Sequence, residues 1–581
     1  MKEGTSPKKP GRPGGPGLRA WLWSLLLPGL LLLMTLACGG ERALPSPPPP
    51  LSSPTPFPLP PPTSPSIPSP TPPPTPTPIP LSLAAGVPIP LQQAATALIE
   101  AYPNRYRPAG DREGGGVQIQ IAPPTPAGPT IEWVYALVAP FPTIPDGVAW
   151  ADVEAAWDGT LTEGPFAHRP LLMSPATEAA LAQAVFGRPP GPDAVLALPA
   201  EQLLDRAWAE RPAWAIVPFE ALEPRWKVLR VDGRSPLDRG LDTRQYPLVV
   251  RLGVTASDPE LAARFLADAT LPLTNRDESQ MTVLLMTGVT ALVRATAWKM
   301  EQKGILYPAQ DIGDWLRSAD ITHISNEIPF AEDCPFPNPV QEDLVFCSDP
   351  RYIELLESIG TDIVELTGNH FADYGAEATL LTVAMYEERG WPYYGGGRNL
   401  AEAQRPVTIT HNGNTFGFLG CNPVGPAFAW ATEEQPGAAP CDFDLMHAQI
   451  RQLRAQGVLP IVTWQYWEFY DYAPTPQQQA DFRGMAEAGA VIVSGSQAHH
   501  PQAIEFYRGA FIHYGLGNLF FDQMDELETR QEILDRHVFY AGRHISTELL
   551  TAMLEEYARP RPMTEEERRQ LLEALFAASG W

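Results

Sequence analysis

The stretch GTDIVELTGNHFADYG, residues 360–375, decides the fold of the second half of this chain. Its apolar run from Ile363 to Leu366 predicts a short buried strand, and a helix is predicted from Leu380 to Arg389. Between them, polar side chains follow the strand at Asn369 and His370. A strand, a polar loop and a helix form the repeating unit of a layered α/β fold, in which ligands bind where the strands end.

The same unit recurs on both sides of this stretch. Strands are predicted at Val283 to Met286, Ile321 to Ile324, Thr415 to Leu419, Val458 to Thr463 and Val491 to Val493, with helices at Trp315 to Ala319 and Tyr352 to Ile359. Three of the strands are followed by Asn326-Glu327, by Gln465 and by Gln497-Ala498-His499-His500. Nine of the ten histidines lie in this half, which we take as residues 279–581. Because imidazole is the commonest side chain for proton transfer and metal binding, we expect the chemistry here.

Residues 83–278 form an earlier and smaller region that is also predicted to be α/β. Helices from Leu91 to Tyr102 and from Thr177 to Phe186 alternate with apolar strands such as Val117 to Ile121. The phrases YALVAPF at 135–141 and AWAIVPF at 213–219 resemble strand ends of the phosphate-type solute-binding proteins. This resemblance implies a solute-binding-like domain, either ligand-binding or only stabilising, and it assigns no ligand residue.

The first 38 residues look like a targeting segment rather than a folded one. Basic residues precede an apolar run from Ala20 to Ala37, which is followed by Cys38. The pattern is similar to a bacterial lipoprotein signal, with Cys38 as the lipidated residue, and the alternative is an uncleaved single-span anchor. Both alternatives predict a membrane partner and an extracytoplasmic location, anchored to the cell membrane. Residues 39–82 are predicted to be a disordered linker, since 20 of the 68 prolines lie between Pro45 and Pro80.

Composition excludes several classes of protein. The chain has 581 residues, 44% of them hydrophobic, and 15 tryptophans, as expected for a packed globular protein. Its net charge of −26 argues against nucleic acid as a partner, because phosphate binding needs a basic surface.

Cysteine usage agrees with a location outside the cytoplasm. Beyond Cys38 the chain has four cysteines, an even number that suggests two disulfides in an oxidising compartment. Sequence proximity favours Cys334–Cys347 and Cys421–Cys441, although four cysteines allow three pairings. A zinc site is disfavoured because no CxxC spacing is present.

Taken in order, the motifs of residues 283–525 resemble the CapA-type capsule (poly-γ-glutamate) synthesis family, within the calcineurin-like metallophosphatase superfamily. The two most specific blocks are the 360–375 stretch and YGLGNLFFDQ at 514–523. Weaker matches are Gly288 to Arg294, Asn326-Glu327, and Gly495 to Gln502. The resemblance implies a four-layer αββα fold with a metal-centred, phosphoesterase-like cleft.

The chain departs from the family pattern at positions that would bind metal. Val289 replaces an aspartate, Gln497 replaces a histidine, and Gln465 stands where another histidine is expected, with Glu468 as a substitute. The resemblance leaves a metal set of Glu327, Asn369 and His499, for a divalent ion such as Mn, Fe or Zn. His370 and His500 are the predicted catalytic residues, His500 alternatively only orienting its neighbour; the predicted substrate-binding residues are Asn326, Gln465 and Gln497.

Three outcomes are consistent with these departures: one retained metal, a substrate site that works by hydrogen bonds, or a catalytically dead scaffold. Whether the chain is an enzyme, a metallophosphatase-like hydrolase or transferase, is therefore left open. The first hypothesis is a membrane-anchored protein that acts on a cell-envelope polymer of the poly-γ-glutamate type. The alternative is a non-catalytic envelope lipoprotein that binds a ligand.

Four further features have interpretations of their own. His323 is predicted to be a core histidine, His513 a structural one, and His537 a surface group. The aromatic run around Gln465, residues 464–470, is typical of a core but is also suited to stacking on sugars at a cleft.

Overall fold

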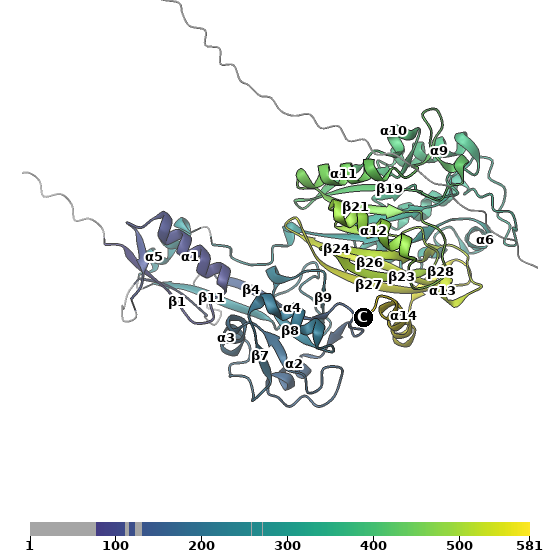
Figure 1. Cartoon of the computed structure of the whole chain (residues 1–581). Coiled ribbons are helices and arrows are strands. Elements are labelled where there is room, and N and C mark those ends of the chain that lie inside the picture. Colours follow the sequence, from purple (N-terminus) through teal and green to yellow (C-terminus); the bar gives the residue numbers. More distant parts are fainter. Residues whose placement is uncertain (1–76, 111–115, 122–129, 257, 270) are drawn as a thin grey trace, which may run out of the picture. The chain divides into compact units, whose positions relative to one another are not determined.

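The computed structural model describes residues 77–110, 116–121, 130–256, 258–269 and 271–581 (Figure 1). The predicted signal or anchor, Cys38 and nearly all of the predicted linker lie outside these residues. The described residues belong to one compact unit. Among their helices, none is both long enough and apolar enough to cross a bilayer.

The first folded region is built on a nine-stranded mixed sheet with the order β2-β1-β3-β11-β4-β8-β6-β7, in which β9 also pairs with β4. The strands are β1 (Ile79–Leu83), β2 (Tyr106–Pro108), β3 (Val117–Ile121), β4 (Thr130–Pro140), β6 (Leu171–Met173), β7 (Val195–Ala197), β8 (Trp214–Pro218), β9 (Trp226–Val228) and β11 (Val249–Ala256), and β5 (Gly147–Val148) pairs with β10 (Arg230–Val231). The helices are α1 (Ile89–Ala101), α2 (Trp150–Trp157), α3 (Pro175–Ala184), α4 (Ala200–Ala209) and α5 (Pro259–Asp268). The predicted α/β class is confirmed, with β1 beginning ahead of residue 83.

The second region contains two larger sheets. The first has nine strands in the order β16-β15-β14-β12-β26-β27-β28, with β13 between β14 and β25. Its strands are β12 (Met281–Met286), β13 (Val289–Thr290), β14 (Ile321–Asn326), β15 (Ile363–Glu365), β16 (Tyr393–Tyr394), β25 (Asn518–Phe520), β26 (Gln531–Tyr540), β27 (Arg543–Glu555) and β28 (Arg559–Pro562). Strands β12, β14, β15 and β16 are parallel, whereas β26 to β28 are antiparallel.

The second sheet has six strands in the order β18-β19-β21-β22-β24-β23, of which the central four are parallel. Its strands are β18 (Val407–His411), β19 (Asn414–Cys421), β21 (Leu459–Trp464), β22 (Ile492–Ser494), β23 (Pro501–Tyr507) and β24 (Ala510–Leu516), and a separate pair joins β17 (Gly396–Gly397) to β20 (Gly437–Ala438). The helices of this region are α6 (Arg294–Lys303), α7 (Gly313–Arg317), α8 (Ile353–Ser358), α9 (Gly375–Glu388), α10 (Leu400–Ala403), α11 (Phe443–Ala455), α12 (Pro476–Ala488), α13 (Leu527–Arg530) and α14 (Glu565–Ala578).

The two sheets pack face to face and are covered by helices on their outer faces (Figure 1). Buried residues of both sheets, among them Met286, Ile363 and Phe418, form one core between them. A second core joins α8 and α9 to the outer face of the first sheet, and a third joins α11 and α12 to the outer face of the second. Since each large apolar side chain contributes about 1.5–3 kcal/mol when buried, these three seams hold the layers together. The predicted four-layer αββα fold is confirmed.

A polar network is buried between the two sheets. Glu365, at the end of β15, accepts hydrogen bonds from Thr367 Oγ1 (2.6 Å) and from Ser496 in the loop after β22 of the second sheet. His323 Nε2 lies 2.8 Å from the Tyr394 hydroxyl, as the prediction of a core histidine with a partner requires. Burial raises the pKa of Glu365 and lowers the pKa of His323 to about 3.

The histidines of the neighbouring strands are buried as well. His513 of β24 lies 2.7 Å from an oxygen of Asp535 in β26, which agrees with the structural role predicted for it. The prediction that His537 lies on the surface is wrong: its side chain is fully buried, with Nδ1 2.9 Å from Thr547 Oγ1. Its ring centre lies 5.2 Å from that of Phe511 in β24, a contact between sheets that local sequence does not reveal.

His323 should make the protein sensitive to acid. Its folded pKa of about 3 lies below the ordinary histidine pKa of 6.5, so the unfolded chain binds more protons between these pH values and stability falls as the pH drops. Each such group contributes a slope of up to about 1.4 kcal/mol per pH unit. We expect His323→Gln, which can still bond Tyr394, to unfold in denaturant with a shallower pH dependence than the wild type. His411→Gln, a change at a half-exposed side chain, is the control; equal slopes in all three proteins would contradict the assignment.

Candidate active site

Loops that follow four parallel strands meet at one edge of the two sheets. Glu327 directly follows β14, and Asn369-His370 lies in the loop after β15. From the second sheet, Glu468 lies in the loop after β21 and His499 in the loop after β22. Parallel strands direct their carboxyl ends to a common edge, which is where the polar side chains gather.

Two glycines allow the loops to approach closely. A Cβ atom on Gly368 would lie 2.4 Å from the backbone oxygen of Glu327, and a Cβ atom on Gly495 would lie 1.9 Å from that of Tyr514. A side chain at either position is excluded by backbone. The first contact fixes the His370 loop beside Glu327, and the second fixes the His499 loop beside the end of β24.

His499 is the centre of the cluster. Its Nε2 atom lies 3.7 Å from Glu327 Oε1 and 3.8 Å from Glu468 Oε1. Its Nδ1 atom lies 2.8 Å from Asn518 Oδ1. The amide nitrogen of Asn518 donates to the carbonyl oxygen of Thr529, so its oxygen is the atom left to face the ring. Nδ1 of His499 therefore carries the proton, and Nε2 faces the two carboxylates.

His370 belongs to the same cluster and has its own carboxylate. Its Nδ1 atom lies 2.7 Å from Asp373 Oδ2, which also accepts the backbone N–H of Phe346 at 2.9 Å. Burial lowers the pKa of His370, but the hydrogen bond to Asp373 and the charges of Glu327, Asp373 and Glu468 outweigh it, so the pKa is raised. A raised pKa keeps a proton available for donation near neutral pH.

An arginine and two phenylalanines connect the histidines. Arg294, at the start of α6, pairs with Asp522, and its guanidinium carbon lies 5.2 Å from the Phe346 ring and 4.9 Å from the Phe521 ring. The Phe346 ring lies 4.8 Å from that of His370, and the Phe521 ring 5.2 Å from that of His499. Sequence reasoning did not select Arg294, Asp522 or Asn518 as site residues, although each lies inside a quoted motif.

Several buried polar atoms at this edge have no hydrogen-bond partner within the described chain. They are Asn326 Oδ1, Glu327 Oε1, Asn369 Oδ1, Gln465 Oε1 and both side-chain polar atoms of Gln497. Buried polar atoms are nearly always satisfied in proteins. A row of unsatisfied ones indicates a place where water or a polar ligand binds.

Some predicted site residues have other contacts. Asn326 donates to the Ile328 carbonyl oxygen at 2.6 Å, and Gln465 donates weakly to that of Tyr466 at 3.4 Å. The His500 ring packs 4.8 Å from Tyr472, and its Nδ1 atom lies 2.6 Å from the Pro501 oxygen. Among the contacts of the described residues, none joins His500 to Glu327, His370 or His499, so its catalytic role stays a prediction.

The aromatic run after β21 divides into two parts. Trp464 and Tyr466 are buried, whereas Trp467, Phe469 and Tyr470 are 55%, 46% and 44% exposed. The Tyr470 hydroxyl donates to Glu468 at 3.2 Å, which places this exposed part beside the cluster. The core interpretation is confirmed for Trp464 and Tyr466, and stacking on sugars stays a prediction for the exposed part.

The side chains do not fit a two-metal centre. No group of three or more His, Cys, Asp or Glu residues in the described ranges could hold a metal ion. Val289 instead joins an apolar cluster with Phe346 and Phe521, the rings that lie against His370 and His499. Metal binding by Glu327, Asn369 and His499 stays a prediction, and we derive the chemistry of the cleft without it.

Asp373→Asn should lower the pKa of His370, because it removes the charge that holds the imidazolium and keeps the shape of the side chain. NMR titration of the ring protons measures this directly. Asp471→Asn, which changes an aspartate in the loop after β21 without a contact to His370, is the control. An unchanged His370 pKa in Asp373→Asn would contradict the role of this pair.

Both predicted disulfides are present, Cys334–Cys347 and Cys421–Cys441. The first lies next to Phe346, whose backbone holds Asp373. We expect Cys334→Ser/Cys347→Ser to lose about 2–4 kcal/mol of stability in denaturant titrations and to shift the His370 NMR signals. Cys421→Ser/Cys441→Ser should lose similar stability and leave those signals in place; a shift in both variants would contradict a local link.

The comparisons with known proteins agree on the second region. Residues 283–523 match the family model described as bacterial capsule synthesis protein PGA_cap. The capsule biosynthesis protein CapA of Bacillus anthracis is 28% identical over 261 residues, covering 44% of this chain and 63% of that protein. The PGA biosynthesis protein CapA of Bacillus subtilis is 27% identical over 225 residues, covering 38% and 59%. The match thus spans less than two thirds of either relative.

Solved structures give weaker likenesses. An ABC-type phosphate transport receptor from Vibrio cholerae has a TM-score of 0.26 at 11% identity and covers 33% of this chain and 92% of that one. The NAD nucleotidase of Haemophilus influenzae has a TM-score of 0.29 at 8% identity and covers 51% and 56%. Likenesses this weak assign neither fold nor ligand, whereas the family match and the two relatives agree with the motifs: residues 283–523 of this chain form a domain of the CapA-type capsule synthesis family.

Proposed function

We propose that this protein acts on a cell-envelope polymer of the poly-γ-glutamate type, through acid–base chemistry at the cleft around His499. The single observation that carries this proposal is the convergence of Glu327, His370 and His499 from separate strands. The family match supports the polymer, because the matched relatives are named for capsule and PGA biosynthesis.

The residues of the cleft suit opposite proton-transfer roles. Nε2 of His499, beside Glu327 and Glu468, can take a proton from an attacking water or amine. His370, whose pKa is raised, can give a proton to the amine that leaves when a γ-amide bond breaks. The γ-amide bond breaks, and its acyl group passes to water or to another amine. His499 accepts one proton from the attacking group, and His370 donates one to the leaving amine.

We place this activity outside the cytoplasm, at the cell membrane. The two disulfides support an oxidising compartment. Anchoring through Cys38 or an uncleaved helix is part of the proposal and concerns residues outside the described ranges.

The alternative is a binding protein without catalysis. The neutral side chains Gln465 and Gln497 favour it, because their unpaired amide atoms can bind a polymer by hydrogen bonds alone. Under this alternative the imidazoles contact the polymer and transfer no proton.

Deleting the gene in its own bacterium and restoring variants tests the proposal. The deletion should lower the envelope polymer that a γ-glutamyl hydrolase can digest, and the wild-type chain should restore it. His499→Ala should restore at least about tenfold less at equal protein level, since positioned acid–base groups contribute about 10²–10⁴-fold to rate. The control is His411→Ala, outside the cleft.

Each contrary result has a clear meaning. Unchanged polymer after deletion would refute the proposed role. Full restoration by both His499→Ala and His370→Ala would refute acid–base catalysis and leave the binding alternative.

A further inference from the structure

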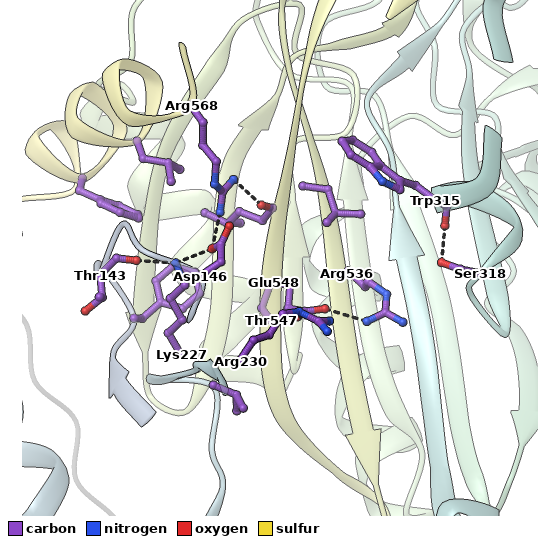
Figure 2. A pocket seen from close by; sticks show the side chains of 16 residues that line it. Thr143, Asp146, Lys227, Arg230, Trp315, Ser318, Arg536, Thr547, Glu548 and Arg568 are labelled. Carbon is purple, nitrogen blue, oxygen red and sulfur yellow. Dashed lines mark hydrogen bonds and ion pairs between the residues drawn. The ribbon is translucent and has the colours of Figure 1, made fainter. Parts of the chain in front are cut away.

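A cavity lies where the first folded region meets the β26–β27 pair and α14 (Figure 2). Its volume is about 320 Å³. Phe141 and Lys227 line it from the first region, and Arg536, Glu548 and Leu572 line it from the second. Cavities of roughly 300 Å³ and more are large enough for a small organic ligand.

The junction around this cavity is firmly packed. Phe141 shares one buried core with Leu572 and Phe576 of α14, and Met281 and Val538 share another with the sheet of the first region. The walls of the cavity are therefore held by both regions, and a ligand in it would contact both.

The cavity is basic, although the chain carries a net charge of −26. Its charged lining residues are the cations Lys227, Arg230, Arg536 and Arg568 and the carboxylates Asp146 and Glu548. Figure 2 shows these side chains in two groups, Asp146 with Lys227 and Arg568, and Glu548 with Arg230 and Arg536. In an acidic protein, such a place attracts anions that the remaining surface repels.

Each carboxylate is shared between two cations. Asp146 accepts from Lys227 at 2.7 Å and from Arg568 at 2.8 Å. Glu548 pairs with Arg536 at 2.7 Å and with Arg230 at 3.5 Å. Arg230 also pairs, at 2.9 Å, with Asp238, which does not line the cavity. Four cations thus line the cavity against two carboxylates, and one positive charge remains in excess when Asp238, the partner of Arg230, is counted with them.

Two further observations indicate the same excess. Nε of Arg568 is buried and has no hydrogen-bond partner in the described part of the chain. Burial lowers the pKa of Lys227 to about 8; Asp146 opposes this change, and the nearby Arg568 cation adds to it. An anion in the cavity would compensate both groups.

The cleft around His499 offers the opposite charge. Glu327, Glu468, Asp373 and Asp522 lie around it, and Arg294 pairs with Asp522. A chain of carboxylates entering that cleft is repelled unless another site holds part of it. The basic cavity can supply that hold, and its apolar residues Phe141, Leu572 and Phe576 suit the methylene groups between the carboxylates.

We propose that this junction cavity binds carboxylate groups of a γ-linked glutamate chain and so retains the polymer on an otherwise acidic protein. The choice of polymer rests on the proposed function. The chemistry of the site, a small polycarboxylate held by arginines above an apolar floor, rests on the cavity.

Calorimetric titration of the full chain with tri-γ-glutamate tests the proposal. We expect saturable, salt-sensitive binding that Arg230→Gln weakens about tenfold or more, because it removes a charged hydrogen-bond donor. Arg561→Gln is the matched control: Arg561 also bridges two carboxylates, Glu555 and Glu567, and does not line the cavity. Arg561→Gln should bind like the wild type.

A second variant shows whether weaker binding results from the lost charge or from loss of folding. Ser318 is an exposed residue at the cavity edge, so Ser318→Glu adds a negative charge there without removing buried packing. It should weaken binding as Arg230→Gln does while unfolding at the wild-type temperature. Equal binding by the wild type and both variants, or no binding at millimolar oligomer, would overturn the proposal. Inorganic phosphate binding as tightly as the oligomer would overturn the carboxylate assignment.

The same titration separates this proposal from the function of the cleft. The two proposals have independent readouts, because His499 does not line the cavity and Arg230 has no contact with His499 among the described residues. If His499 proves dispensable in cells but Arg230→Gln still loses binding, the catalytic proposal fails and the cavity stands. If the amount of polymer in cells depends on His499 but the wild type does not bind tri-γ-glutamate, the cavity proposal fails and the catalytic proposal stands.

Discussion

The structure of the second region depends on one constraint: two sheets must bury their apolar faces against each other while helices cover both outer faces. Parallel strands in both sheets then end at a shared edge, and the loops after β14, β15, β21 and β22 lie next to one another. The site is a consequence of this packing, because Glu327, His370, Glu468 and His499 come from four segments that are far apart in the sequence.

Sequence reasoning predicted the repeated units of this fold well, because each strand is an apolar run and each is followed by polar residues. It also predicted that Glu327, His370 and His499 would meet. It could not predict Asn518 as the partner of His499, or that Arg294 and Asp522 lie between the histidines, because these contacts join segments more than a hundred residues apart or depend on side-chain direction. His537 shows the same limit: a lone histidine in a strand carries no local sign of the second sheet that covers it.

Val289, which stands where the family pattern has an aspartate, is part of an apolar cluster in the structure. Val289 does not leave a gap where a carboxylate is expected; it packs with two phenylalanines that touch the rings of His370 and His499. Apolar contacts and the amide of Asn518 therefore support the two imidazoles. The carboxylates of Glu327 and Asp373 lie beside them. This arrangement suits proton transfer and hydrogen bonding better than the binding of two divalent ions.

The Cys334–Cys347 bridge adds a consequence for the timing of activity. Cys347 adjoins the residue whose backbone holds Asp373, and Asp373 in turn holds the imidazole of His370. Thiols stay reduced inside the cell, so a newly made chain would reach the membrane with this support unfinished. Under the proposed extracytoplasmic location, the bridge that supports Asp373 and His370 forms only after export.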